Sequence, residues 1–224
     1  DAGGAYIKTY LKHENIIVYD EKYIHVWPVH PYDRLVELIK EKKWENLSIG
    51  VEMDSHYYTA YCHQKLLHGL PNAKIKDSER LVNWVRLVKS NEEIKFMKIA
   101  AEITQLGMKK AFEVINPGVR QCDAVAKIYS TLISGTKDHG GDYSSIVPLL
   151  PTGKGTSASH LTWSDDKFVD GEASIIEISG AYKKYHCPMA RTVLLGKPDQ
   201  KKIDTMKKTR EALEAGIDAT KPGN

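Results

Sequence analysis

The sequence predicts a mixed α+β protein built from two domains, residues 1–88 and 89–224. Three observations support this fold class. Short apolar runs alternate with helical patterns up to residue 88, two long amphipathic helices follow, and a pair of apolar strands comes after them. Such an alternation of strands and helices is typical of proteins in which helices pack on a sheet.

The first domain is expected to alternate strands with helices. Its apolar runs are short, as strands are, and its helical stretches place apolar residues three or four positions apart. Ser55 is the expected N-cap of the second helix, which Gly69 and Pro71 close. In chain order we expect strands over 16–20 and 23–27, a helix over 32–44, a strand over 47–53, a helix over 55–71, and a strand and then a helix within 73–90.

The second domain is expected to begin with two helices. Ser90 followed by Glu93 forms a capping-box pattern, which marks a helix start. An apolar stripe continues from Ile94, and Asn116-Pro117-Gly118 ends the helix. A second helix is expected over 121–135, before a polar, glycine-rich stretch.

A hairpin is expected over residues 175–192, IIEISGAYKKYHCPMART. Glu177 is a lone carboxylate in its first strand, where burial is costly unless a partner is present. That partner is either a structural cation or a bound ligand. The period of two in a strand places His186 and Pro188 on one face and Cys187 on the other, where we expect it in the core.

The end of the chain echoes its middle. Residues 108–118 and 209–223 are both amphipathic helical patterns that close in Pro-Gly. An internal duplication explains the echo, although Pro-Gly is also common after helices. The chain starts with Asp rather than Met and stops soon after a helix, so a fragment truncated in its C-terminal half is expected.

The charge balance, the apolar runs and the cysteines of the sequence argue against several classes of function. The chain has 32 basic and 29 acidic residues, and this balance argues against a dedicated nucleic-acid-binding protein. No apolar run is long enough to cross a membrane. The 3 cysteines show no CxxC spacing, so we expect a reducing, cytoplasmic environment.

Several segments together resemble the superfamily of creatinase, prolidase and methionine aminopeptidase. The resemblance covers residues 89–224 well and the earlier part loosely, through IGVEMD. It implies the pita-bread fold, in which two αβ repeats enclose one site, behind a smaller creatinase-like N-terminal domain. The segments are KSNEEIKFMKIAAEIT, AFEVINPGVRQCDAVA, SASHLTW, GEASIIEISG and MARTVLLG.

The resemblance also implies the site residues. Metallopeptidase members have a histidine ahead of the hairpin and then two aspartates, eleven residues apart, that bridge two metal ions. His160 matches the histidine, Glu177 the first aspartate and Pro188 the second. Because proline cannot supply the bridging oxygen that a two-metal site needs, we expect neither a metal nor another cofactor.

Within the superfamily the chain is most similar to ectoine hydrolase and creatinase, through IVPLLPTG, SASHLTW and YHCPMARTV. This similarity implies hydrolysis of a C–N bond in a small, zwitterionic amidine or guanidino acid. His160 is then expected to transfer protons, and Glu177 to pair with the amidinium group. The resemblance also implies a homodimer.

Four further residues are candidate substrate contacts, and for three of them a structural role is the alternative. His186 is expected to face the same cavity as Glu177. Trp163 could form the wall of the pocket or serve in packing, and Tyr143 could line its mouth or lie at the surface. Arg191 could pair with a substrate carboxylate or form a structural salt bridge.

Two other functions remain open at this point. One is a metal-dependent Xaa-Pro dipeptidase or aminopeptidase with altered ligands, against which Pro188 argues. The other is a non-catalytic pita-bread module that binds peptides or proteins, against which His160 and Glu177 argue. A zinc site among His56, His63 and His68 is not expected, since their spacing lacks the i, i+4 pair of helical zinc sites.

Overall fold

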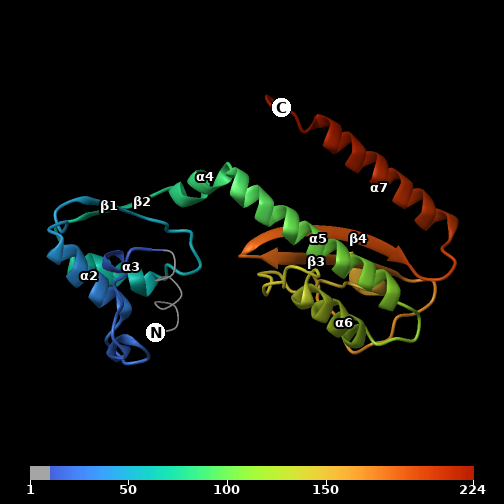
Figure 1. The fold of residues 1–224 in the computed structure, drawn as a ribbon, viewed down its shortest axis with the longest axis horizontal. Coiled ribbons are helices and arrows are strands. Elements are labelled where there is room, and N and C mark those ends of the chain that lie inside the picture. Colours follow the sequence, from blue (N-terminus) through green and yellow to red (C-terminus); the bar gives the residue numbers. More distant parts are fainter. Residues whose placement is uncertain (1–10) are drawn as a thin grey trace. The chain divides into compact units, whose positions relative to one another are not determined.

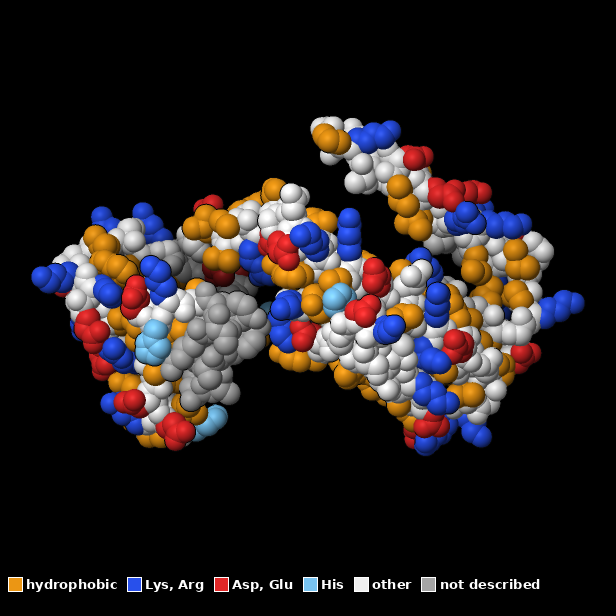
Figure 2. Space-filling view, viewed as in Figure 1, with side chains coloured by type: hydrophobic (Ala, Val, Ile, Leu, Met, Phe, Trp, Pro, Cys, Tyr) orange, Lys and Arg blue, Asp and Glu red, His pale blue; other side chains and the backbone are white. Residues whose placement is uncertain are grey.

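The structure is a computed structural model that describes residues 11–224 (Figure 1). The chain divides into two compact units, residues 1–88 and 89–224. Across the described residues, none of the helices combines the length and the apolar character that a membrane span requires. Figure 2 shows basic and acidic side chains interspersed on the visible face, in agreement with the balanced composition.

The first unit is built on two parallel strands that a helix connects. Ile49 of β1 pairs with Ile75 of β2, and α3 forms the crossover between the strands. Helices α2 and α3 contact each other and bury Val36 and Leu66 in a small core. In chain order the unit contains η1 (His13–Asn15), η2 (Glu21–Tyr23), α2 (Pro31–Glu41), β1 (Ser48–Val51), α3 (Ala60–Gly69), β2 (Lys74–Asp77) and α4 (Leu81–Leu87).

Two expectations for this unit were wrong. The runs 16–20 and 23–27 form no strand; most of their residues are exposed, and an apolar run without a pairing neighbour gains nothing from an extended conformation. Ser55 does not cap α3. The chain makes two turns after β1, and Thr59 Oγ1 accepts the backbone N–H of Cys62 at 3.2 Å, so His56 precedes the helix.

The second unit packs two helices on a hairpin. Figure 1 shows α5 lying across β3 and β4, with α6 beside it. The predicted capping box of α5 is confirmed: Ser90 Oγ accepts from the Glu93 N–H, and a Glu93 oxygen accepts from the Ser90 N–H at 2.6 Å. The elements are α5 (Asn91–Val114), α6 (Gln121–Ser134), η3 (Gly153–Ser157), β3 (Ala173–Tyr182), β4 (Tyr185–Leu194) and α7 (Gln200–Ala219).

Helix α5 approaches the hairpin closely at Gly180. A Cβ atom there would lie 2.6 Å from the carbonyl oxygen of Ala100, so no larger residue fits without a backbone shift. Thr104, which is fully buried, accepts the Gly180 N–H with its hydroxyl at 2.8 Å. The same hydroxyl lies 2.6 Å from the Cys187 carbonyl oxygen, and it therefore links α5 to both strands. This contact fixes the hairpin that carries Glu177.

The two strands of the predicted hairpin are joined by a two-residue turn, Lys183-Lys184. Lys183 and Lys184 have φ of +47° and +68°, the left-handed values that two-residue hairpin turns require. After the hairpin, α7 is exposed along nearly its whole length. Met206, Leu213 and Ile217 lie on its surface, and Figure 2 shows apolar side chains along it.

Candidate active site

Glu177 lies on the side of the hairpin turned away from α5. In the antiparallel register Glu177 is opposite Ala190, and Ser179 is opposite Pro188. Directly opposite residues project to the same side of a sheet, so these four residues form one surface, the Glu177 face. The neighbouring Ile178 projects to the other side and is fully buried in the core with α5.

His160 and Glu177 form the central pair of the site. His160 Nε2 lies 3.7 Å from Glu177 Oε2, which is ion-pair distance and longer than a hydrogen bond. The His160 side chain is 74% exposed and that of Glu177 is 28% exposed. The imidazole is thus open to solvent, whereas the carboxylate is largely enclosed. The structure therefore brings together the two residues that the sequence predicts to be catalytic.

One segment, residues 142–152, connects the two halves of this pair. Its Leu149 exchanges two backbone hydrogen bonds with Glu177, at 2.9 and 3.0 Å. The next residue, Leu150, donates its N–H to the carbonyl of Leu161, the neighbour of His160, at 3.0 Å. The 142–152 segment therefore sets where both backbones lie. Sequence analysis missed this role, because backbone pairing leaves little mark on side-chain types.

His186 is on the Glu177 side of the hairpin, as the period of two predicts, but it is far along the strand. It pairs with Ala181, four residues from Glu177, and this spacing corresponds to about 13 Å. Its ring nitrogens contact Ser145 and the Lys184 carbonyl. Cys187 projects to the α5 side, opposite Gly180, and is half-buried.

The other three candidates lie apart from the pair. Arg191 is opposite Ile176, on the α5 side of the hairpin, and its guanidinium donates to the Ala190 carbonyl at 2.7 Å. Trp163 packs against the core and lines a cavity of about 710 Å³ whose lining includes neither member of the pair. Tyr143 is exposed, with the Lys184 ammonium 3.8 Å from its ring centroid. Their contacts with substrate stay predictions.

The donor set of the Glu177 face does not fit a bridged pair of metal ions. Of its four residues, Glu177 alone has a carboxylate; Pro188 and Ala190 have no ligand atom in their side chains, and the Ser179 hydroxyl donates to the Gly180 carbonyl. Within residues 11–224, no three His, Cys, Asp or Glu side chains gather in an arrangement able to hold a metal ion.

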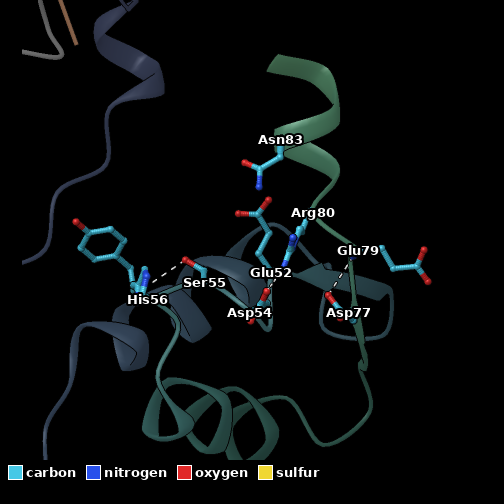
Figure 3. A pocket seen from close by; sticks show the side chains of 9 residues that line it. Glu52, Asp54, Ser55, His56, Asp77, Glu79, Arg80 and Asn83 are labelled. Atoms are coloured by element: carbon cyan, nitrogen blue, oxygen red, sulfur yellow. Dashed lines mark hydrogen bonds and ion pairs between the residues drawn. The ribbon is translucent and has the colours of Figure 1, made fainter. Parts of the chain in front are cut away.

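The first unit has a separate polar cavity of about 620 Å³, at the ends of its parallel strands (Figure 3). Glu52 follows β1 and points toward Asn83 of α4, while Asp54 forms an ion pair with Arg80. One Glu52 oxygen is buried and has no hydrogen-bond partner within residues 11–224. Sequence analysis missed this cavity; acidic residues directly after two parallel strands were the available signal.

Comparison with known proteins shows which protein families the two units resemble. Residues 95–224 match Metallopeptidase family M24, and residues 5–88 match the Creatinase/Prolidase N-terminal domain. The chain is 40% identical over its full length to the ectoine hydrolase of Halomonas elongata, covering 58% of that protein. It is 23% identical to the Xaa-Pro dipeptidase of Pyrococcus furiosus, with 86% of the chain and 52% of that protein aligned.

Solved structures show the same fold. A prolidase from Thermococcus sibiricus superposes with a TM-score of 0.76 at 20% identity, over 95% of this chain and 55% of that one. The prolidase from Pyrococcus horikoshii OT3 gives 0.73 at 22% identity, over 85% and 52%. The chain thus spans a little more than half the length of these relatives. It belongs to metallopeptidase family M24, within the creatinase and prolidase superfamily of pita-bread proteins.

Proposed function

We propose that this protein hydrolyses a C–N bond at the amidine-like carbon of a small amidine or guanidino acid, without a metal ion. The observation that carries the proposal is the His160–Glu177 pair, 3.7 Å apart, on a face whose second ligand position is Pro188. The 40% identity to an ectoine hydrolase supports the substrate class, since ectoine is a cyclic amidine acid.

Each side chain of the pair has one role in this reaction. The Glu177 carboxylate pairs with the amidinium, whose positive charge makes its carbon electrophilic. His160 takes a proton from the attacking water as the new C–O bond forms. It then returns a proton to the nitrogen, which leaves with the electrons of the C–N bond. A positioned base of this kind contributes about 10²- to 10⁴-fold in rate, and a cationic carbon needs less activation than a peptide carbonyl.

The substrate class is tested by turnover with and without a chelator. Ectoine, creatine and Gly-Pro are incubated separately with the protein, before and after treatment with EDTA. Hydrolysis of ectoine or creatine at the same rate in both conditions is expected. Cleavage of Gly-Pro that EDTA abolishes would favour an Xaa-Pro dipeptidase and reject the proposal. No turnover of any substrate would favour a binding module.

The roles of the pair are tested by substitution. His160 has φ +61°, a left-handed conformation that Asn tolerates well, so His160→Asn removes the imidazole with little backbone strain. We expect kcat to fall by about 10²- to 10⁴-fold. Glu177→Gln should mainly raise KM, because the amide cannot pair with a cation. His13→Asn, at an exposed histidine of the first unit, is the control. Unchanged kcat in His160→Asn would remove this residue from its role.

A further inference from the structure

The partners of His186 fix the position of its proton. Nδ1 is 2.9 Å from the carbonyl oxygen of Lys184, which can only accept, so Nδ1 carries a hydrogen. Nε2 is 3.1 Å from the backbone nitrogen of Ser145, which can only donate, so Nε2 presents its lone pair. Both contacts are satisfied by the Nδ1–H tautomer of the imidazole. The Ser145 hydroxyl, 3.2 Å from Nε2, can donate to the same lone pair.

The contacts of His186 belong to a cluster at the turn of the hairpin. Asp142 accepts the backbone N–H of Lys184 at 3.1 Å, and its carboxylate also lies 3.8 Å from the Lys184 ammonium. That ammonium sits over the ring of Tyr143. His186 and Asp142 therefore attach the 142–152 segment to the hairpin at two points, Ser145 and Asp142 itself. His186 and Tyr143, two of the residues that sequence analysis assigned to substrate, thus have partners within this cluster.

The position of Ser145 affects the catalytic pair through the residues that follow it in the chain. Three residues separate Ser145 from Leu149, and a chain of this length spans at most about 14 Å, so the two residues are joined by a short connection. Leu149 then pairs with the backbone of Glu177, and Leu150 donates its N–H to the carbonyl of Leu161. A displacement at Ser145 therefore reaches both sides of the pair.

We propose that His186 is a positioning residue: it holds Ser145, and through the 142–152 segment it sets the separation of His160 and Glu177, without touching substrate. The activity part of this inference rests on the proposed function. The structural part does not, because the tautomer and the Ser145 hydrogen bond exist in the protein without substrate.

The structural part is tested by NMR on the full chain at pH 8. Nitrogen-15 spectra should show His186 protonated at Nδ1 and not at Nε2. In His186→Ala the Ser145 amide should exchange with solvent faster by about three- to tenfold, the loss expected for one hydrogen bond. His186→Gln, whose amide oxygen can accept the same N–H, should restore part of the protection. An Nε2–H tautomer, or unchanged Ser145 exchange in His186→Ala, would overturn the proposal even in a protein without measurable turnover.

The activity part is tested by separating kcat from KM. His186→Ala should lower kcat for the preferred substrate by about tenfold and leave KM within about twofold, because misplacing a catalytic pair affects the reaction more than binding. His186→Gln should recover part of kcat. His13→Asn, at an exposed histidine of the first unit, is the control and should stay within about twofold of the wild type. A raised KM with unchanged kcat in His186→Ala would indicate direct substrate contact and overturn the positioning role.

Discussion

Replacing Thr104 by Val should destabilise the second unit by about 2–3 kcal/mol. Thr104 is fully buried, and its hydroxyl accepts the Gly180 N–H at 2.8 Å. Valine has nearly the same shape but removes the hydroxyl that this buried N–H contacts, at a cost of about 1–3 kcal/mol. The one hydrogen of the hydroxyl, which can go to the Cys187 carbonyl at 2.6 Å or the Ala100 carbonyl at 2.9 Å, is lost as well. The total corresponds to a fall in Tm of roughly 10 °C for a domain of this size.

Urea unfolding followed by circular dichroism measures this effect, and hydrogen exchange of the β3 and β4 amides locates it. Thr104→Ser keeps the hydroxyl and loses one buried methyl, so it should cost only about 1 kcal/mol. Thr131→Val is the matched control, because the Thr131 hydroxyl donates to Lys127 in the preceding turn of α6 and should matter by less than about 0.5 kcal/mol. The reasoning fails if Thr104→Val is as stable as the wild type, or more stable than Thr104→Ser.

Two further predictions concern stability. Gly180→Ala should cost at least about 2 kcal/mol in urea unfolding, because its Cβ would lie 2.6 Å from the Ala100 oxygen; Gly216→Ala, in open space on α7, should be neutral or stabilising, and equal costs at the two sites would contradict the packing argument. The backbone N–H of Ser90, followed by the Ser90 hydroxyl, lowers the pKa of Glu93 below 4.5. The stability that this bond supplies is therefore present above the unfolded pKa and is lost as pH falls through the folded value. In Glu93→Gln the urea concentration at half-unfolding should therefore decrease less between pH 6 and pH 3 than in the wild type. An unchanged pH profile would count against a stabilising Ser90–Glu93 hydrogen bond.

Features set by neighbouring residues could be predicted from the sequence. Ser90 and Glu93 are three positions apart, and their capping box forms as soon as the first turn of α5 does. The hairpin likewise depends on a local pattern and a short turn. The choice between Ser55 and Thr59 as the cap of α3 was harder, because both are good caps and the turns after β1 decide between them.

Features that need a distant partner could not be predicted in the same way. The run 16–20 has the residue types of a strand, but a strand forms only when another pairs with it. His160 and Glu177 could be related through the resemblance to a family, not through local spacing. The partner of His186 is a backbone N–H in a polar stretch, 41 positions away, and a backbone donor is the same for nearly every residue type.

Pro188 has a consequence for the backbone hydrogen bonds of the hairpin. The backbone N–H and C=O of Glu177 bond Leu149 and not β4. In an antiparallel pair the opposite residue, Ala190, then also directs its backbone groups away from its partner strand, toward the outer margin of β4. The same holds for Pro188, two positions earlier. A proline at this position breaks no rung of the hairpin ladder. It does remove a donor from a margin that has no further strand beside it within residues 11–224. Pro188 therefore fits the hairpin without costing it a backbone hydrogen bond.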